Sequence, residues 1–365
     1  MNSLVKLGAL TNIRTGKLDA NASSDDGEYP FFTCSKEPLR IASYSYDCEC
    51  VLVAGNGDLN VKYYSGKFDA YQRTYIIESI DKSRLLVKYL YFFLYIYVEV
   101  LRTQSIGGVI KYIKLGNLTD AMIPLPSIET QAKIVAKLEK CDTLINVRLS
   151  QLDALNQLVK SRFIELFGDP KYNKRTLVKI GEIGVLTSGG TPSRAKSEYY
   201  EGNIRWYSAG ELNSLYLPDS AEHISETALQ QSSAKLFNKG TLMIGMYDTA
   251  AFKMGILTED SSSNQACANL NPKQGYNIVW LYYLFDIMKP IFLQERQGVR
   301  QKNLSLSKIK EFEVPSAPFE LQNEFAAFVE QVDKSKYYSS LSYQCCQQAA
   351  SYYRQEWITC RISNF

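Results

Sequence analysis

The sequence predicts an α+β protein in which two mixed α/β domains are separated by an antiparallel pair of long coiled-coil helices, with a pseudo-two-fold internal repeat. Residues 107–139 match residues 298–330 without a gap, at an offset of 191 residues. Each copy continues into a long stretch with apolar residues at heptad spacing, which is typical of helices that pack by supercoiling. A sequence unit that occurs twice is expected to form the same structure twice.

The repeat also includes the start of each half. Residues 5–10 (VKLGAL) match residues 178–183 (VKIGEI) at an offset of 173 residues. Because the two offsets differ, the globular part of the second half must be longer than that of the first. We therefore expect a first domain at residues 1–126, a helix with a linker at 127–173, a second domain at 174–317 and a second helix at 318–365.

Both domains are predicted to mix short strands with one buried helix. Residues 50–53 and 74–77 are β-branched runs that predict strands, and residues 55–58 (GNGD) predict a turn. Residues 87–94 and 278–285 match at the 191-residue offset and are apolar on all sides. A helix of this kind is expected inside the core of each domain.

The two long helices carry the clearest periodicity. The predicted seam of the first helix alternates steps of four and three residues through Ile134, Leu138, Cys141, Ile145, Arg148, Leu152, Leu155, Val159, Arg162 and Leu166. The same phase on the second helix gives Phe325, Val329, Val332, Lys336, Ser339, Tyr343, Cys346, Ala350, Tyr353 and Trp357. Gly168 is expected to end the first helix. Because a domain precedes each helix, the two helices must run antiparallel if they pair.

Composition excludes several protein classes. The length of 365 residues allows two or three domains, and the net charge of +3 would not by itself suggest a nucleic-acid partner. The eight cysteines form no C-x-x-C pair and His223 is the single histidine, so a zinc site is not expected. The adjacent Cys345 and Cys346 suit the reduced thiols of a cytoplasmic protein. No apolar run approaches the roughly 20 residues that a membrane span needs.

Three segments carry a family resemblance. Residues 123–170 begin with IPLPSIETQAKIVAKLEKCDTLI and end with FGDP, residues 186–213 read LTSGGTPSRAKSEYYEGNIRWYSAGELN, and residues 61–78 read VKYYSGKFDAYQRTYIIE. The first resembles the central conserved helix of type I restriction-modification specificity subunits, and the other two resemble their target recognition domains. The second helix departs from this pattern, because residues 345–360 read CCQQAASYYRQEWITC in place of a leucine-rich seam.

The resemblance implies a DNA-binding subunit without catalytic activity. It implies that each target recognition domain reads one half of a bipartite site on double-stranded DNA, and that the helices hold the domains at a fixed separation. It also implies two copies of a modification (methyltransferase) subunit, which carry S-adenosylmethionine, and restriction (translocase/nuclease) subunits, which use ATP. The chain itself is expected to hold no cofactor. The residues expected on the subunit-docking helices are Gln131, Ile134, Leu138, Leu152, Gln322, Phe325 and Val329.

Two basic stretches are candidates for DNA contact. No acidic residue occurs from Arg296 to Lys310, which includes Arg300, Lys302 and Lys308. The matching stretch from Leu101 to Thr119 holds Arg102, Lys111 and Lys114 and also lacks acidic residues. Such cations could contact phosphates or guanine edges, or could belong to a solvated edge. Arg73 is a further candidate, whereas Trp206 is expected to be a buried aromatic.

Two other functions remain open at this point. A self-sufficient DNA methyltransferase or nuclease would need catalytic motifs, but Asp169-Pro170 and Asn271-Pro272 lack the second proline of an amino-methylating site. Residues 189–192 (GGTP) lack the lysine of a phosphate-binding loop, and His223 has no recognisable nucleophile near it in the sequence. The other alternative is a coiled-coil scaffold protein without a DNA role.

Overall fold

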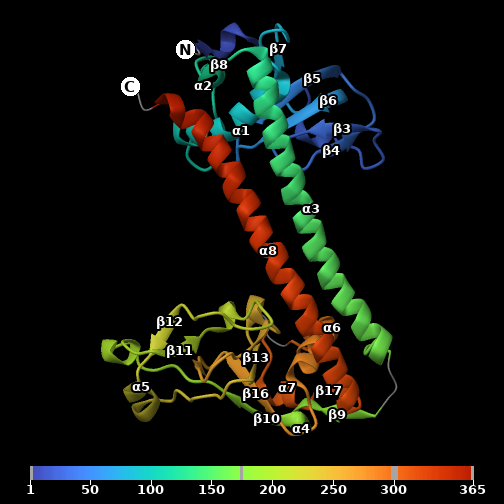
Figure 1. Cartoon of the computed structure of the whole chain (residues 1–365), viewed down its shortest axis with the longest axis vertical. Helices are drawn as coiled ribbons and strands as arrows, with labels where there is room; N and C mark the ends of the chain where they lie inside the picture. Colours follow the sequence, from blue (N-terminus) through green and yellow to red (C-terminus); the bar gives the residue numbers. More distant parts are fainter. Residues whose placement is uncertain (1–2, 173–175, 297–302, 363–365) are drawn as a thin grey trace. The chain divides into compact units, whose positions relative to one another are not determined.

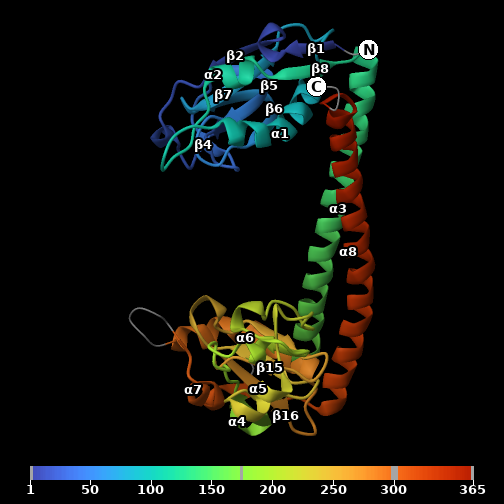
Figure 2. The ribbon, with the colours of Figure 1, turned by 90° about the vertical axis from the view of Figure 1, so that its left-hand side faces the viewer.

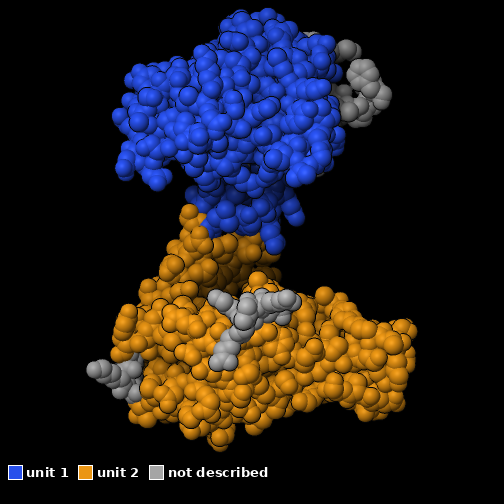
Figure 3. Space-filling model, turned by 180° about the vertical axis from the view of Figure 1, so that it is seen from behind, with its two compact units in different colours: residues 1–149, 342–365 blue, residues 150–341 orange. Residues whose placement is uncertain are grey.

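The computed structural model describes residues 3–172, 176–296 and 303–362, with side chains described up to Tyr353. The chain divides into two compact units, one of residues 1–149 with 342–365 and the other of residues 150–341 (Figure 3). Each unit combines one mixed α/β domain with parts of two long helices (Figure 1). The predicted α+β class and internal repeat are confirmed.

The domain of the first unit, domain 1, is built on a six-stranded sheet with strand order β2-β7-β5-β6-β3-β4. All neighbours pair antiparallel except β3 and β6. The strands are β2 Thr11–Thr15, β3 Tyr29–Phe32, β4 Leu39–Ile41, β5 Tyr46–Ala54, β6 Val61–Ala70 and β7 Thr74–Ser79. Helix α1 (Val87–Gln104) packs on β5 and β6, and its buried Tyr89, Leu90 and Leu94 join the core, as its apolar pattern predicts.

The domain of the second unit, domain 2, divides its strands between two sheets. One has the order β10-β16-β13-β14 and the other β12-β11-β15. The strands are β10 Gly184–Ser188, β11 Ile204–Tyr207, β12 Glu222–Ile224, β13 Leu242–Gly245, β14 Met254–Ile256, β15 Ser262–Ser263 and β16 Cys267–Pro272. Helix α6 (Ile278–Phe292) is buried along one side, with Trp280 and Phe285 in the core.

Each domain has a two-stranded antiparallel pair that joins its first strand to its last. In domain 1, β1 (Ser3–Lys6) pairs antiparallel with β8 (Met122–Leu125), and in domain 2, β9 (Leu177–Lys179) pairs antiparallel with β17 (Glu313–Pro315). The registers correspond, because Val5 faces Ile123 and Val178 faces Val314. Ion pairs also correspond, at 2.8 Å for Lys6–Asp120 and 2.6 Å for Lys179–Glu311.

Short helices complete both domains. Helices α2 (Leu115–Thr119) and α7 (Leu306–Glu311) occupy matching places before β8 and β17. The remaining short elements are α4 Ile180–Ile183, α5 Glu226–Gln231 and the 3₁₀ turns Leu7–Ala9, Ala20–Ala22, Ser197–Tyr200, Ala209–Glu211, Asp248–Ala250 and Leu293–Glu295.

A buried glutamine fixes the start of each long helix to its domain. The Gln131 Oε1 accepts from the Leu86 amide at 3.0 Å, and its Nε2 donates to the carbonyls of Arg84 at 2.7 Å and Pro126 at 2.9 Å. Gln322 repeats these bonds one for one. Its Oε1 accepts from the Asn277 amide at 2.8 Å, and its Nε2 donates to the carbonyls of Gly275 at 3.4 Å and Ala317 at 2.8 Å. Every partner pair lies 191 residues apart, so the repeat extends to single hydrogen bonds.

The long helices α3 (Ile128–Phe167) and α8 (Phe319–Ile362) lie side by side and antiparallel (Figure 2). In the second unit, the Phe325 ring packs 5.2 Å from Phe163 and 5.9 Å from Phe167. In the first unit, the Lys137 ammonium lies 5.5 Å from the Tyr353 ring. The start of each helix therefore meets the end of the other.

The predicted seams are confirmed over most of their length. None of the ten predicted positions on α3 is exposed, and on α8 the same holds from Phe325 to Ala350. Tyr353 is an exception, because it is exposed, and the side chain of Trp357 lies outside the described residues. Helix α3 ends at Gly168 as predicted, since this glycine has a φ of 73° and its amide donates to the Ile164 carbonyl. Within the described ranges, no helix is both long and apolar enough to cross a membrane.

Candidate nucleic-acid interface

Two of the predicted DNA-contact residues lie together in domain 1, on either side of one tight turn. The Gly55 amide donates to the Arg73 carbonyl at 2.8 Å, and the Gly57 amide donates to the Lys111 carbonyl at 2.9 Å. Gly57 has a φ of 68°, which glycine adopts at little cost, so the predicted turn at residues 55–58 is confirmed. Arg73 and Lys111 are both exposed and have no ion-pair partner among the described residues.

The segment around Lys111 is a closed loop. Ile106 and Tyr112 exchange two backbone hydrogen bonds, at 2.9 and 3.0 Å, and enclose residues 107–111. Gly107 has a φ of 116°, and a Cβ there would lie 2.5 Å from the Ile110 carbonyl oxygen. Only glycine therefore fits at the base of this loop.

The loop is also held from below by the sheet. The Ile113 amide donates to the Gly55 carbonyl at 2.9 Å, and the Tyr75 hydroxyl donates to the Ile113 carbonyl at 3.2 Å. Burial raises the pKa of Tyr75 above its ordinary value, so this hydroxyl stays protonated and able to donate. These bonds position Lys111 against the sheet of domain 1.

Arg102 requires a correction, because its guanidinium is already occupied inside the chain. It forms ion pairs with Glu99 and, at 3.3 Å, with Asp58, and it donates to the Leu59 carbonyl at 2.7 Å. This residue therefore braces the end of α1 against the turn and is not a free cation. Lys114, the other candidate on this stretch, is exposed at the start of α2, where its backbone amide donates to the Asn117 Oδ1 at 2.7 Å.

A groove of about 420 Å³ lies beside Arg102. It is lined by one face of α1 and by the start of β6, with Lys36 and Lys62 on its wall. Burial lowers the pKa of Lys62, whose ammonium donates to the Asn60 side chain. The groove therefore brings Lys36 and Lys62 close to the turn between Arg73 and Lys111, and the sequence did not indicate it.

The corresponding residues of domain 2 are described only in part. Arg296 is half-buried, and its Nε donates to the Leu293 carbonyl at 3.0 Å. Arg300 and Lys302 lie outside the described residues. The described residues that follow repeat the framework of domain 1, because the Leu304 amide donates to the Met246 carbonyl at 2.8 Å just as the Ile113 amide donates to the Gly55 carbonyl.

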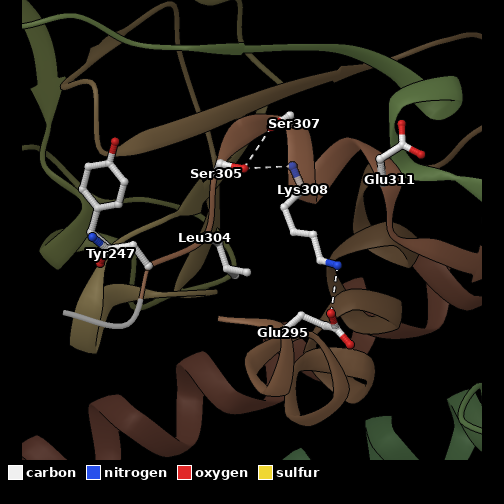
Figure 4. A pocket seen from close by; sticks show the side chains of 8 residues that line it. Tyr247, Glu295, Leu304, Ser305, Ser307, Lys308 and Glu311 are labelled. Carbon is white, nitrogen blue, oxygen red and sulfur yellow. Dashed lines mark hydrogen bonds and ion pairs between the residues drawn. The ribbon is translucent and has the colours of Figure 1, made fainter. Parts of the chain in front are cut away.

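Domain 2 has a polar pocket of about 550 Å³ next to this framework (Figure 4). Lys308 on α7 reaches across it to Glu295 at 2.8 Å. The pocket is lined by Tyr247, Glu295, Asn303, Leu304, Ser305, Ser307, Lys308 and Glu311. In domain 1, the matching pair is neutral, with the Asn117 Nδ2 donating to the Gln104 Oε1 at 3.2 Å. The 191-residue repeat could have indicated this site, since it aligns Asn117 with Lys308 and Gln104 with Glu295.

The other motifs considered in the sequence prove to be structural. Trp206 is buried as predicted, and its indole donates to the Gly190 carbonyl at 3.0 Å. The amides of Gly189 and Gly190 donate to the Cys267 and Ser263 carbonyls at 3.2 and 2.8 Å, so they do not form a phosphate cradle. His223 sits on β12 with its Nε2 3.0 Å from the Asp219 carboxylate.

Most of the side chains chosen on the subunit-docking helices face other parts of the same chain. Gln131, Leu138, Gln322, Phe325 and Val329 are all buried by neighbours within the chain. They hold the helices to their own domains and to each other, so another subunit cannot contact them directly. Ile134 and Leu152 are half-buried in the seam. Sequence periodicity therefore identified the packed face of each helix.

Both halves of the chain match one known family. The family model for the type I restriction modification DNA specificity domain matches residues 2–157 and 173–337. The chain is 40% identical to the EcoDI specificity subunit of Escherichia coli over 156 residues, which are 43% of this chain and 34% of the relative. It is 29% identical to the MjaIX specificity subunit of Methanocaldococcus jannaschii over 160 residues, 42% of this chain and 37% of the relative. It is 25% identical to the EcoR124I/EcoR124II specificity subunit of Escherichia coli over 282 residues, 71% of this chain and 65% of the relative. The chain therefore spans about a third of the length of the first two relatives.

Solved structures share the fold over almost the full length. The type I restriction-modification S subunit from M. genitalium superposes with a TM-score of 0.65, covering 97% of this chain and 95% of that chain, at 17% identity. A second structure, described as showing complex assembly and conformational transition of the type I R-M system, gives a TM-score of 0.58 over 97% of both chains, at 15% identity. At such identities the likeness supports the fold alone.

Proposed function

The chain belongs to the type I restriction-modification DNA specificity family, and from this premise we propose that it reads a bipartite DNA site for partner subunits that methylate and cut. The observation that carries this proposal is the repeat of one domain framework, with its buried glutamine and matching strand registers, in both halves. Two such domains with different surface loops suit a DNA site with two different halves. The cations beside the domain 1 turn, Arg73 and Lys111, are candidates for contact with DNA phosphates.

We propose that the helix pair sets the gap between the two half-sites, that is, the number of base pairs between them that the protein does not read. Helix α3 runs for 40 residues without interruption from one domain into the other, and at 1.5 Å per residue this is about 60 Å. Helix α8 covers its seam in both units. A pair of packed helices resists bending better than a single chain segment, so it is suited to fix a spacing, as dimer spacing does in other DNA readers.

We further propose that the outer face of the helix pair docks two copies of a modification subunit. Leu144, Val147 and Leu158 are exposed on α3 at heptad spacing, on a face distinct from the buried seam. Tyr337 and Tyr338 are exposed on α8. An apolar stripe at this spacing fits a helix from another protein. The modification subunits would carry S-adenosylmethionine, and restriction subunits, which use ATP, would join that complex in the cytoplasm.

The proposal is tested by methylation with purified components. The chain combined with the modification subunits of its own system and S-adenosylmethionine should methylate one bipartite DNA motif, which sequencing of modified bases would identify. The modification subunits alone should show no such motif, and neither should this chain alone. Methylation by this chain without a partner would support the rival enzyme function. A complete complex that binds and methylates DNA without sequence preference would contradict the proposal.

A further inference from the structure

The loop of residues 107–111 in domain 1 carries two apolar side chains at its tip. Val109 is 103% exposed and Ile110 is 61% exposed, among the largest exposures of any described apolar residue. The closure between Ile106 and Tyr112 and the anchors to Gly55 and Gly57 hold the loop in one conformation. A loop tied to the sheet that presents two adjacent β-branched side chains to water keeps apolar surface available for contact with a partner.

Charge around the tip indicates a polyanionic partner. Lys111 is the next residue along the chain, and Arg73 lies across the Gly55–Gly57 turn. The nearby acids Asp58 and Glu99 are both paired with Arg102, and Asp58 is also 3.8 Å from Lys36. The tip is therefore apolar and lies beside two cations, Lys111 and Arg73. The acidic residues near these cations are paired with other side chains of the chain. DNA fits this arrangement, because its phosphates flank grooves that expose apolar groups only at defined bases.

The apolar group that B-DNA exposes on a base edge is the C5 methyl of thymine, which lies in the major groove. We propose that Val109 and Ile110 read a thymine of the first half-site through this methyl group, while Lys111 and Arg73 hold the neighbouring phosphates. This inference rests on the proposed function and extends it from a DNA-binding domain to a class of base. It also predicts that the first half-site contains at least one A·T pair.

The second half of the chain supports a reading role for this loop position. In the 191-residue alignment, Val109 and Ile110 match Arg300 and Gln301, whereas Lys111 matches Lys302. In the aligned sequences, the cation is thus kept in both halves, whereas the two residues before it change from apolar to hydrogen-bonding side chains. Arginine and glutamine are the side chains that pair with guanine and adenine edges, and valine and isoleucine can only make apolar contacts.

Insertion of the tip between two bases is the competing mode. It would require unstacking of a base step, which costs a few kcal/mol. Contact with a methyl group that is already exposed in the groove has no such cost. The affinity of an inserted tip for DNA would also not depend on the methyl group of thymine. The two modes therefore give opposite results with DNA in which thymine is replaced by deoxyuridine, which keeps every hydrogen bond and lacks only the methyl.

The experiment uses the complex of this chain with its modification subunits. First, the methylated motif is mapped, and replacement of domain 2 identifies which half domain 1 reads. Each thymine of the first half-site, on both strands, is then replaced singly by deoxyuridine in the binding duplex. Binding should weaken about fourfold at one thymine, the loss expected for one buried methyl group, and remain unchanged at the others and throughout the second half-site.

A double variant tests whether the loss of affinity with deoxyuridine depends on the tip of the loop. V109N/I110Q should bind the thymine and deoxyuridine duplexes with equal affinity, because it has no apolar tip. Ile80→Gln is the matched control, since Ile80 is 66% exposed in the same domain outside the loop, and it should keep the fourfold difference. Thermal unfolding of both variants should match that of the unaltered chain.

Three results would overturn the inference. Equal binding of all deoxyuridine duplexes by the unaltered complex excludes the methyl contact. A rise in 2-aminopurine fluorescence at one base step, without deoxyuridine sensitivity, assigns the tip to insertion. A first half-site made only of G·C pairs also contradicts it. Failure of the proposed function is distinguishable, because the complex would then methylate no bipartite motif in the first step, and the inference would fall with it.

Discussion

At the scale of single residues, Gln131 and Gln322 show how the repeat is built into the chemistry of the chain. Each glutamine satisfies one backbone amide and two carbonyls at partly buried positions. A shorter apolar side chain at either position leaves these groups unpaired, and each unpaired group costs about 1–3 kcal/mol.

We therefore expect Gln131→Ala and Gln322→Ala to lower the free energy of unfolding by similar amounts, about 2–4 kcal/mol each. Gln157→Ala is the control, because Gln157 is exposed on α3 and its replacement should change stability by less than about 0.5 kcal/mol. Urea denaturation of the full chain measures all three. Equal effects of Gln157 and the buried glutamines would show that the hydrogen bonds do not anchor the helices.

The cations of domain 1 give a second prediction at this scale. Lys111→Ala and Arg73→Ala should each reduce the slope of log affinity against log salt by about one, because each removes one phosphate contact. Arg102→Ala should leave the slope nearly unchanged, since that guanidinium is paired with Glu99 and Asp58. DNA titrations of the assembled complex at several salt concentrations measure the slopes. The assignment is wrong if Arg102 contributes as much as Lys111.

The sequence could predict which candidate cations are exposed only where their neighbours in the sequence decide it. The acid-free stretch pointed to Lys111 and Lys114, and both are exposed. It also pointed to Arg102, although Glu99, three residues earlier in the sequence and also on α1, pairs with it. The second partner, Asp58, comes from a distant turn. Contacts of that kind depend on the folded sheet and leave no local pattern.

At the scale of elements, the heptad pattern predicted both seams because it reflects burial directly. The seam stayed recognisable even where polar residues occupy it, since Lys336 and Ser339 are not exposed. Lys336 achieves this by pairing with Asp333 at 3.1 Å. The residues predicted on the subunit-docking helices lie on or beside this seam for the same reason. A hydrophobic repeat marks the face that a helix buries in its own chain, and here that face leaves no room for a partner.

The length of the helix pair should determine the gap between the two half-sites. Four residues inserted after Leu149 in α3 and after Leu341 in α8 lengthen each helix by about 6 Å, between one and two base-pair steps, and turn it by just over one full turn. Both insertions fall where the chain passes from one compact unit to the other, so the contacts inside each unit stay intact. The two methylated half-sites should remain the same while the gap between them grows.

Two inserted residues at the same places provide the control. They rotate the helices by more than half a turn, so the apolar seams no longer face each other. This variant should lose methylation at every gap length. If the four-residue variant is folded and still methylates only the original gap, the helices do not set the spacing.

At the scale of the whole molecule, the sequence predicted two domains and two helices because the repeat is long and has no gaps. It did not predict that domain 1 forms one six-stranded sheet while domain 2 divides into a four-stranded and a three-stranded sheet. The offset is 173 at Gly189, which matches Gly16, and 191 at Met246, whose carbonyl takes the place of that of Gly55, so the additional residues lie between these two positions. There β11 and β12 supply two of the three strands of the smaller sheet, and their runs of four and three residues are too short for an alternating pattern.

The central claim is that each domain reads its own half-site. It is tested most directly by replacing residues 174–317 with the equivalent domain of another family member and mapping methylated bases in DNA. The join points lie beside β9 and β17, which pair with each other, so the exchanged piece carries its own strand partner. The account predicts that one half of the bipartite motif changes, while the other half stays the same. A change in both halves, or in neither, in a folded and active complex would contradict it.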